Sequence, residues 1–245
     1  MSKPGHIFLK ELGRTKLRPG GGKVTKWLFS TVDFNHKNVL EIACNAGGNL
    51  IDLRSRYNVK LTGIDLDEEV IKEAKENLQA LDYDDVDLKI MDATNLEFED
   101  ESFDIIINEA MLTMLSPKLR DKALKEYRRV LKKGGYLLTH DVSIPLGYEE
   151  KELSKTISHR VYPQTEAKWD ELFKNHGFKT EFKLTGKFLL MDKKQVIEDE
   201  GPVAAAKFFK AAKENINTVQ FKRMNMGLHD GDKKFIAYCL RRQDD

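Results

Sequence analysis

One short stretch constrains the fold of this chain more than any other, the run N-V-L-E-I-A-C-N-A-G-G-N at residues 38–49. Its first part is apolar, as expected for a strand that is buried on both faces. A turn of small residues follows at once, and Leu50, Ile51 and Leu53 then begin a helical pattern. Strand, tight turn and helix form the opening of a βαβ unit, which in many proteins holds a nucleotide-like ligand.

The turn departs from the dinucleotide-binding pattern G-x-G-x-x-G. Ala43 and Asn45 occupy the first two glycine places, and only Gly48 fits the third. Asparagine tolerates a left-handed backbone better than other non-glycine residues, so Asn45 can still form the turn. We therefore expect a ligand without a pyrophosphate, and an NAD-dependent enzyme is disfavoured.

Apolar strand patterns and helical patterns alternate along the next hundred residues. The expected strands after the first are residues 59–65, 86–91, 103–109 and 136–141, with a K-K-G-G turn at 132–135 before the last of them. This alternation predicts an α/β fold, a doubly wound, mostly parallel seven-stranded Rossmann-like sheet. Asp67 is the expected N-cap of the helix that follows the second strand.

The chain is expected to add helical segments at both ends of this sheet. We predict an N-terminal arm and helix at residues 1–32, and a main α/β domain at 33–245 with residues 142–163 and 191–232 as lid or binding-site insertions. Thr165 is expected to cap a helix, and residues 178–190 and 233–241 to be strands. An amphipathic helix after Gly201 and Pro202 carries an apolar stripe that includes Phe208 and Phe209.

Composition restricts the classes of function. With 41 basic and 40 acidic residues the formal net charge is +1, so no overall field attracts nucleic acid. The only two cysteines argue for a reducing compartment and against a thiolate metal site, and we expect no metal. No apolar run reaches transmembrane length and residues 1–22 lack a signal-peptide core, so we expect a cytoplasmic protein without a membrane partner.

Four acidic residues mark the carboxyl ends of four expected strands: Glu41, Asp65, Asp92 and Glu109. They are spaced by about one βα unit each, and ligands of an open parallel sheet bind beyond these strand ends. One such carboxylate can simply cap the next helix. Four in register with a turn of small residues indicate a site for a cationic ligand rich in hydroxyl groups.

The segment E-x-A-x-N-x-G at residues 41–47 resembles the first motif of class I S-adenosylmethionine-dependent methyltransferases, commonly [D/E]-x-G-x-G-x-G. The resemblance covers residues 39–142 and extends more loosely to the C-terminus. It is closest to the small-molecule branch that contains quinone and sterol methyltransferases. It implies methyl transfer by in-line displacement from S-adenosyl-L-methionine to a small acceptor with an apolar part, with S-adenosyl-L-homocysteine as the product.

The resemblance also implies roles for particular residues. Glu41 and the turn would hold the methionine end of the cofactor, Asp65 the ribose and Asp92 the adenine amine, while Asn108 and Glu109 would face the transferable methyl group. The expected cofactor-binding set is Arg18, Glu41, Ala43, Asn45, Gly47, Asp65, Leu66, Asp92, Ala93, Asn108 and Glu109. His140 and Glu109 are the candidate catalytic groups, and a purely structural role for His140 stays open at this point.

Two other functions stay open from the sequence. One is an RNA methyltransferase that uses the basic row of the second insertion, formed by Lys207, Lys210, Lys213, Lys222 and Arg223. The small net charge and the absence of an N-P-P-Y-like run at 108–111 argue against it. The other is a non-catalytic S-adenosylmethionine-binding or regulatory protein, which the altered glycine places would allow. The sequence leaves the oligomeric state open.

Overall fold

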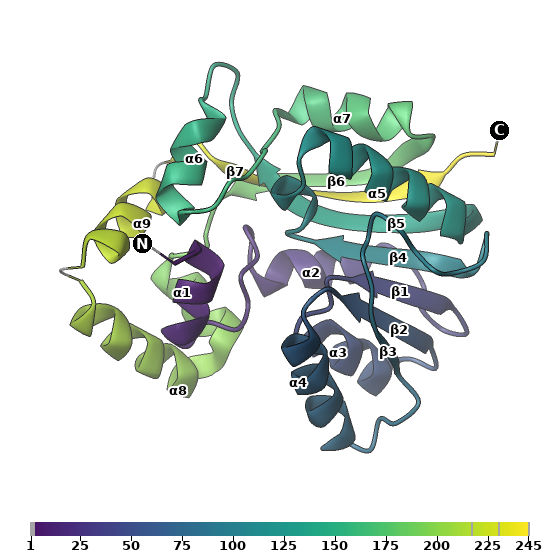
Figure 1. Cartoon of the computed structure of the whole chain (residues 1–245), viewed down its shortest axis with the longest axis horizontal. Helices are drawn as coiled ribbons and strands as arrows, with labels where there is room; N and C mark the ends of the chain where they lie inside the picture. The colour runs from purple at the N-terminus through teal and green to yellow at the C-terminus, as the bar shows by residue number, and fades with distance from the viewer. Residues whose placement is uncertain (1–2, 217, 230, 245) are drawn as a thin grey trace.

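A seven-stranded sheet forms the centre of the molecule, in the order β3-β2-β1-β4-β5-β7-β6 (Figure 1). The computed structural model describes residues 3–216, 218–229 and 231–244. All neighbouring strands are parallel except at β7, which is antiparallel to both β5 and β6. The strands are β1 Asn38–Ile42, β2 Lys60–Asp65, β3 Asp87–Ile90, β4 Phe103–Glu109, β5 Leu131–Ser143, β6 Phe178–Lys187 and β7 Lys234–Arg242. This confirms the predicted α/β fold class.

Helices cover both faces of the sheet, because the central strands are apolar on both faces. One face carries α2 Gly22–Phe29, α3 Gly48–Arg56 and α4 Glu68–Gln79, and the other carries α5 Pro117–Val130 and α7 Glu166–Asn175. The expected caps are present: Asp67 accepts from the amides of Glu69 and Val70, and Thr165 accepts from that of Lys168. Leu40 and Ile106 lie in one core and Val39 and Ile107 in the other, since side chains alternate along each strand.

A third group of helices lies beside the sheet, at the left of Figure 1. It consists of α1 Gly5–Glu11, α6 Glu150–Ile157, α8 Lys193–Glu214 and α9 Val219–His229. These helices share a hydrophobic cluster with Val142 and Ile144, at and just beyond the end of β5. We call this group the helical cap. It combines the N-terminal α1 with helices from later in the chain, and it adjoins the side of the sheet where β5 ends. No helix in the described ranges is long and apolar enough to cross a membrane.

Several expected boundaries are wrong, and the structure gives a reason for each. Residues 132–135 do not form a separate turn before β5. They lie within β5, which begins at Leu131, and they bulge out of its pairing with β4 between Leu131 and Tyr136. Residues 188–190 leave β6, since the amide of Leu189 donates to the carbonyl of Pro19 in the N-terminal arm. The second insertion holds two helices, and α8 begins before Gly201 and bends there, at φ 79°.

Candidate functional site

Glu41 and Glu109 point to the same face of the sheet and meet at the carboxyl ends of β1 and β4. These strands are parallel neighbours with Glu41 opposite Ile107, so residues of like parity share a face. Nδ2 of Asn49, in the first turn of α3, lies 2.7 Å from Oε1 of Glu41 and 3.0 Å from Oε2 of Glu109. The predicted convergence of these two carboxylates is thus present, and it depends on Asn49, which is not among the predicted site residues.

The N-terminal arm reaches the same cluster through Arg18. Its Nε lies 3.1 Å from Oε2 of Glu109, and its Nη2 donates to Oδ1 of Asn49 at 2.9 Å. Arg18 therefore lies at the end of β4, beside Glu109 and Asn49.

His140 extends the cluster onto β5, directly opposite Glu109 in the register. Its Nδ1 lies 3.1 Å from Oε1 of Glu109, and its Nε2 accepts from the backbone amide of Gly20 at 3.0 Å. The imidazole is fully buried. Thr25, from α2, donates its hydroxyl to the same Oε1 at 2.8 Å. The two candidate catalytic groups are thus in contact with each other.

The two buried acids differ in charge state. Burial raises the pKa of Glu41 to about 8, and the opposing effects of Arg18 and of the Asn49 hydrogen bond are too small to restore it. Burial acts in the same direction on Glu109, but Arg18, His140 and Asn49 outweigh it and lower the pKa of Glu109 to about 2. At neutral pH the site therefore holds one ionised carboxylate and one neutral carboxyl group.

The turn after β1 has a left-handed backbone at three residues, and only one of them is a glycine. Ala43 has φ 55°, Asn45 has φ 49° and Gly47 has φ 79°. The left-handed conformation costs a non-glycine residue about 1–2 kcal/mol, less for asparagine. The two altered glycine places thus keep the conformation that glycine would adopt. The expectation that Asn45 can form this turn is confirmed.

Asp65 and Asp92 lie at the ends of β2 and β3 and hold their own loops. Asp65 accepts from the amides of Asn45 at 3.1 Å and Asp67 at 3.2 Å, and Asp92 accepts from that of Thr94 at 2.8 Å. Both carboxylates therefore stabilise the loop that follows their own strand, which is a structural role independent of any ligand. Asp65 is half-buried and Asp92 is exposed, so both side chains also remain accessible to a ligand.

The remaining predicted residues are divided between two places. Leu66 is 67% exposed beside Asp65, and Ala93 is buried next to Asp92. Asn108 is fully buried but follows the opposite parity to Glu109, so its side chain points to the other face of the sheet, toward the core that contains α5. Neither side-chain atom of Asn108 has a hydrogen-bond partner among the described residues. The structure thus separates the side chain of Asn108 from the cluster of Glu41, Asn49 and Glu109, which we call the carboxylate cluster.

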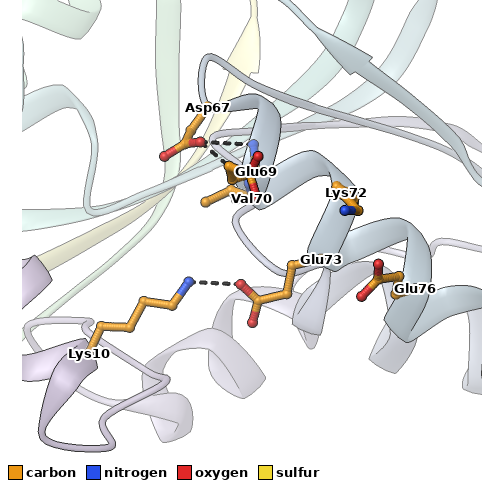
Figure 2. Close-up of a pocket in the computed structure, with 7 residues that line it drawn as sticks. All are labelled: Lys10, Asp67, Glu69, Val70, Lys72, Glu73 and Glu76. Atoms are coloured by element: carbon orange, nitrogen blue, oxygen red, sulfur yellow. Dashed lines mark hydrogen bonds and ion pairs between the residues drawn. The ribbon is translucent and has the colours of Figure 1, made fainter.

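A surface groove of about 330 Å³ lies between α1 and α4 (Figure 2). Nζ of Lys10 on α1 lies 2.8 Å from Oε2 of Glu73 on α4, and Asp67 stands at one end of the groove. Charged, exposed side chains form most of the lining, so the groove offers little contact to an apolar ligand. Here α1 lies close to the start of α4, which follows β2 and Asp65. Neither Glu41 nor Glu109 lines the groove.

The donor and acceptor groups at the strand ends fit S-adenosylmethionine. Oε2 of Glu41 is buried and has no hydrogen-bond partner among the described residues, and it lies beside the turn of small residues. An ammonium group is the partner that such an oxygen lacks, and it would also stabilise the ionised form of Glu41. Asp65 can accept from a ribose diol, as an acid at this place does in dinucleotide-binding folds.

Known proteins resemble this chain in sequence and in fold. The family described as "Methyltransferase domain" matches residues 39–135. An uncharacterised protein of Haemophilus influenzae is 41% identical over 97% of this chain and 98% of its own length. The phthiotriol/phenolphthiotriol dimycocerosates methyltransferase 1 of Mycobacterium ulcerans is 38% identical over 45% of this chain, which spans only 40% of that relative.

A solved structure extends the likeness to almost the whole fold. Phosphoethanolamine N-methyltransferase 2 of Haemonchus contortus, solved with S-adenosylhomocysteine, aligns with a TM-score of 0.74 at 18% identity. The alignment covers 97% of this chain and 57% of that one. The motif at residues 41–47 lies inside the matched family region, at the turn where the strand-end acids converge. The chain is therefore an enzyme of the S-adenosylmethionine-dependent methyltransferase family, with S-adenosylmethionine as its cofactor.

Proposed function

We propose that this enzyme methylates a small molecule with an apolar part, bound between the strand ends and the helical cap. The observation that carries the proposal is that the Glu41–Asn49–Glu109 cluster lies at the side of the sheet where the cap's apolar cluster adjoins the end of β5. Apolar walls with a few convergent polar groups are typical of small-molecule sites. The names of the M. ulcerans and H. contortus relatives support small acceptors of two kinds, a phthiotriol lipid and a phosphobase.

The proposed roles follow the chemistry of each side chain. Glu41 binds an ammonium group, Asp65 the ribose hydroxyls and Arg18 a carboxylate, and the backbone of Ala43, Asn45 and Gly47 allows close approach. Asp92 and Ala93 receive the adenine. When bound, the cofactor supplies a methyl group that its sulfonium already activates.

The protein then needs to hold the acceptor, exclude water and receive a proton. Holding the reacting atoms in line can contribute up to roughly 7–11 kcal/mol. We assign proton acceptance to Nε2 of His140, because Glu109 at Nδ1 stabilises a positive charge on the ring. The arm and the cap exclude water from this end of the sheet.

Formation of S-adenosylhomocysteine tests the proposal. The enzyme is incubated with S-adenosylmethionine and, separately, with quinols, sterols, phosphobases and transfer RNA. We expect product with one small-molecule class, and a loss of about 10²–10⁴-fold in kcat for His140→Gln with little change in cofactor affinity. Methylation of RNA alone would contradict the acceptor class, and a fully active His140→Gln enzyme would contradict the role of His140.

A further inference from the structure

The carboxylate of Glu109 is saturated by donors from four separate segments, namely α2, α3, β5 and the N-terminal arm. Oε1 receives the hydroxyl of Thr25 and Nδ1 of His140, and Oε2 receives Nδ2 of Asn49 and Nε of Arg18. The side chain is only 4% exposed. A carboxylate with four donors at 2.8–3.1 Å has little capacity left to take a proton from an acceptor. Glu109 is thus placed to orient its neighbours.

The hydrogen bonds of His140 determine its tautomer. A backbone amide can only donate, so Nε2, which faces the amide of Gly20, carries a lone pair. The proton of the neutral ring is then on Nδ1, where it donates to Glu109. This is the tautomer that a proton acceptor needs, but its lone pair is covered by the Gly20 amide.

Gly20 belongs to a segment that fits tightly between the sheet and the cap. We call residues 20–22 the triglycine strap. A Cβ at Gly20 would lie 2.8 Å from the ring of Phe235, and one at Gly21, where φ is 72°, would lie 2.3 Å from the side chain of Gln195. The amide of Gly22 donates to Oδ1 of Asp199 on α8 at 2.7 Å. Gly20 and Gly21 therefore leave no room for a side chain, because the sheet and the cap touch the strap on either side.

We infer that Glu109 is a positioning residue that fixes His140 with its proton on Nδ1, and that the triglycine strap covers Nε2 until the acceptor replaces the Gly20 amide. The inference rests on the proposed function in one respect, that His140 receives the acceptor's proton. The strap is attached to α8 through Asp199, so acceptor entry and the position of the cap are coupled. A hydroxyl or amine on the acceptor would take the place of the amide as donor to Nε2.

Replacing Glu109 by glutamine should invert this arrangement. Two donors, from Asn49 and Arg18, face the Oε2 position, so the new amide places its oxygen there and its NH2 group toward Thr25 and His140. The hydroxyl of Thr25 can turn to accept, but Nδ1 of His140 must become an acceptor. The ring proton then moves to Nε2 and opposes the Gly20 amide, which displaces the strap.

Nuclear magnetic resonance of the full chain measures both features without any acceptor. Nitrogen-15 spectra of histidine-labelled protein near pH 7.5 report which ring nitrogen carries the proton, and His140→Gln assigns the signal. We expect a protonated Nδ1 and a Gly20 amide that exchanges slowly with solvent. In Glu109→Gln the proton should be on Nε2 and Gly20 should exchange at least tenfold faster, while the Gly47 amide, bonded to the carbonyl of Cys44, serves as the internal reference.

The chain offers a matched control in a second histidine–carboxylate pair. Nε2 of His176 lies 3.0 Å from Oδ1 of Asp121, remote from the strap in sequence, and Asp121→Asn should change only the His176 signals. Wild-type His140 with its proton on Nε2, or on both nitrogens, would overturn the inference even if Glu109→Gln does not fold. An unchanged tautomer and unchanged Gly20 exchange in a folded Glu109→Gln would overturn it as well. Failure of the proposed function would show separately, as full methyl transfer by His140→Gln.

Discussion

Nε of Arg18 lies 3.1 Å from Oε2 of Glu109, so the N-terminal arm supplies the charge that neutralises the acid at the end of β4. Glu41 shares the Asn49 amide with Glu109, but its second oxygen has no partner among the described residues. Burial outweighs this compensation at Glu41 but not at Glu109. Glu41 therefore remains protonated at neutral pH in the folded protein, and this makes the stability of the enzyme depend on pH.

Glu41 should lower stability as the pH rises. Burial raises its pKa to about 8, whereas the ordinary value is 4.5. Above pH 4.5 the unfolded chain loses this proton while the folded protein keeps it, so the contribution of Glu41 to stability is complete below pH 4.5 and is lost as the pH rises to about 8. Denaturant unfolding should show a decline of at most ~1.4 kcal/mol per pH unit between pH 5 and 8. Glu41→Gln should remove most of it.

The control for this experiment is Glu97→Gln, at an exposed position away from the carboxylate cluster. Its unfolding free energy should follow the wild-type curve at each pH. A Glu41→Gln protein with the same pH dependence as the wild type would show that Glu41 is already ionised at neutral pH in the folded state.

Ala43→Gly should stabilise the fold. Ala43 has φ 55°, a conformation that glycine adopts without steric cost. Relief of this strain exceeds the extra entropy that glycine gives the unfolded chain, so we expect a gain of about 0.5–1 kcal/mol in the free energy of unfolding. Thermal unfolding measures it, with Ala46→Gly in the same turn as the control, because no left-handed φ occurs at Ala46. A destabilised Ala43→Gly would contradict the strain.

The sequence predicts the sheet and the strand-end acids because both depend on short-range patterns. Apolar runs identify the buried strands, and Glu41 and Asp65 are found by their places at the strand ends. The caps formed by Asp67 and Thr165 are local too, and both are confirmed. The family assignment in turn decides between the enzyme and the non-catalytic alternative.

Other parts of the site depend on contacts between distant segments, which no local pattern specifies. Thr25 reads as an ordinary helix residue, yet it bonds to Glu109, 84 positions away. Asn49 is closer to a local signal, since it ends the motif stretch and lies in the first turn of α3, beside the strand end. The end of β6 was missed because Pro19 of the arm takes the amide of Leu189. Such pairings become visible only in three dimensions.

The helical cap should affect the acceptor more than the cofactor. Phe209 is partly buried against the cap cluster, whereas Phe208 is fully inside it and contacts Arg14. Phe209→Asp should therefore leave the fold intact, raise the KM for the acceptor about tenfold or more, and leave cofactor affinity within about twofold, because a charge disfavours an apolar ligand. Steady-state kinetics and calorimetry measure the two effects.

The control for the cap is Val203→Asp, which places the same charge on the same helix at a position that is 71% exposed. Its kinetics should match the wild type. If Phe209→Asp instead loses cofactor affinity, or changes only the oligomeric state, the cap does not form the acceptor site. Acceptor selection would then have to be sought in the N-terminal arm and in residues 142–163.

Calorimetric titration with S-adenosylmethionine tests the central claim, that the strand-end acids bind this cofactor, most directly. We predict binding in the micromolar range for the wild type and none for NAD. Asp65→Ala should lose about 1.5–3 kcal/mol of binding free energy, the usual scale for hydrogen bonds to a charged group, while Asp87→Ala at the opposite end of the neighbouring strand should lose none. Unchanged affinity in a folded Asp65→Ala protein, or binding of NAD in place of S-adenosylmethionine, would contradict the account.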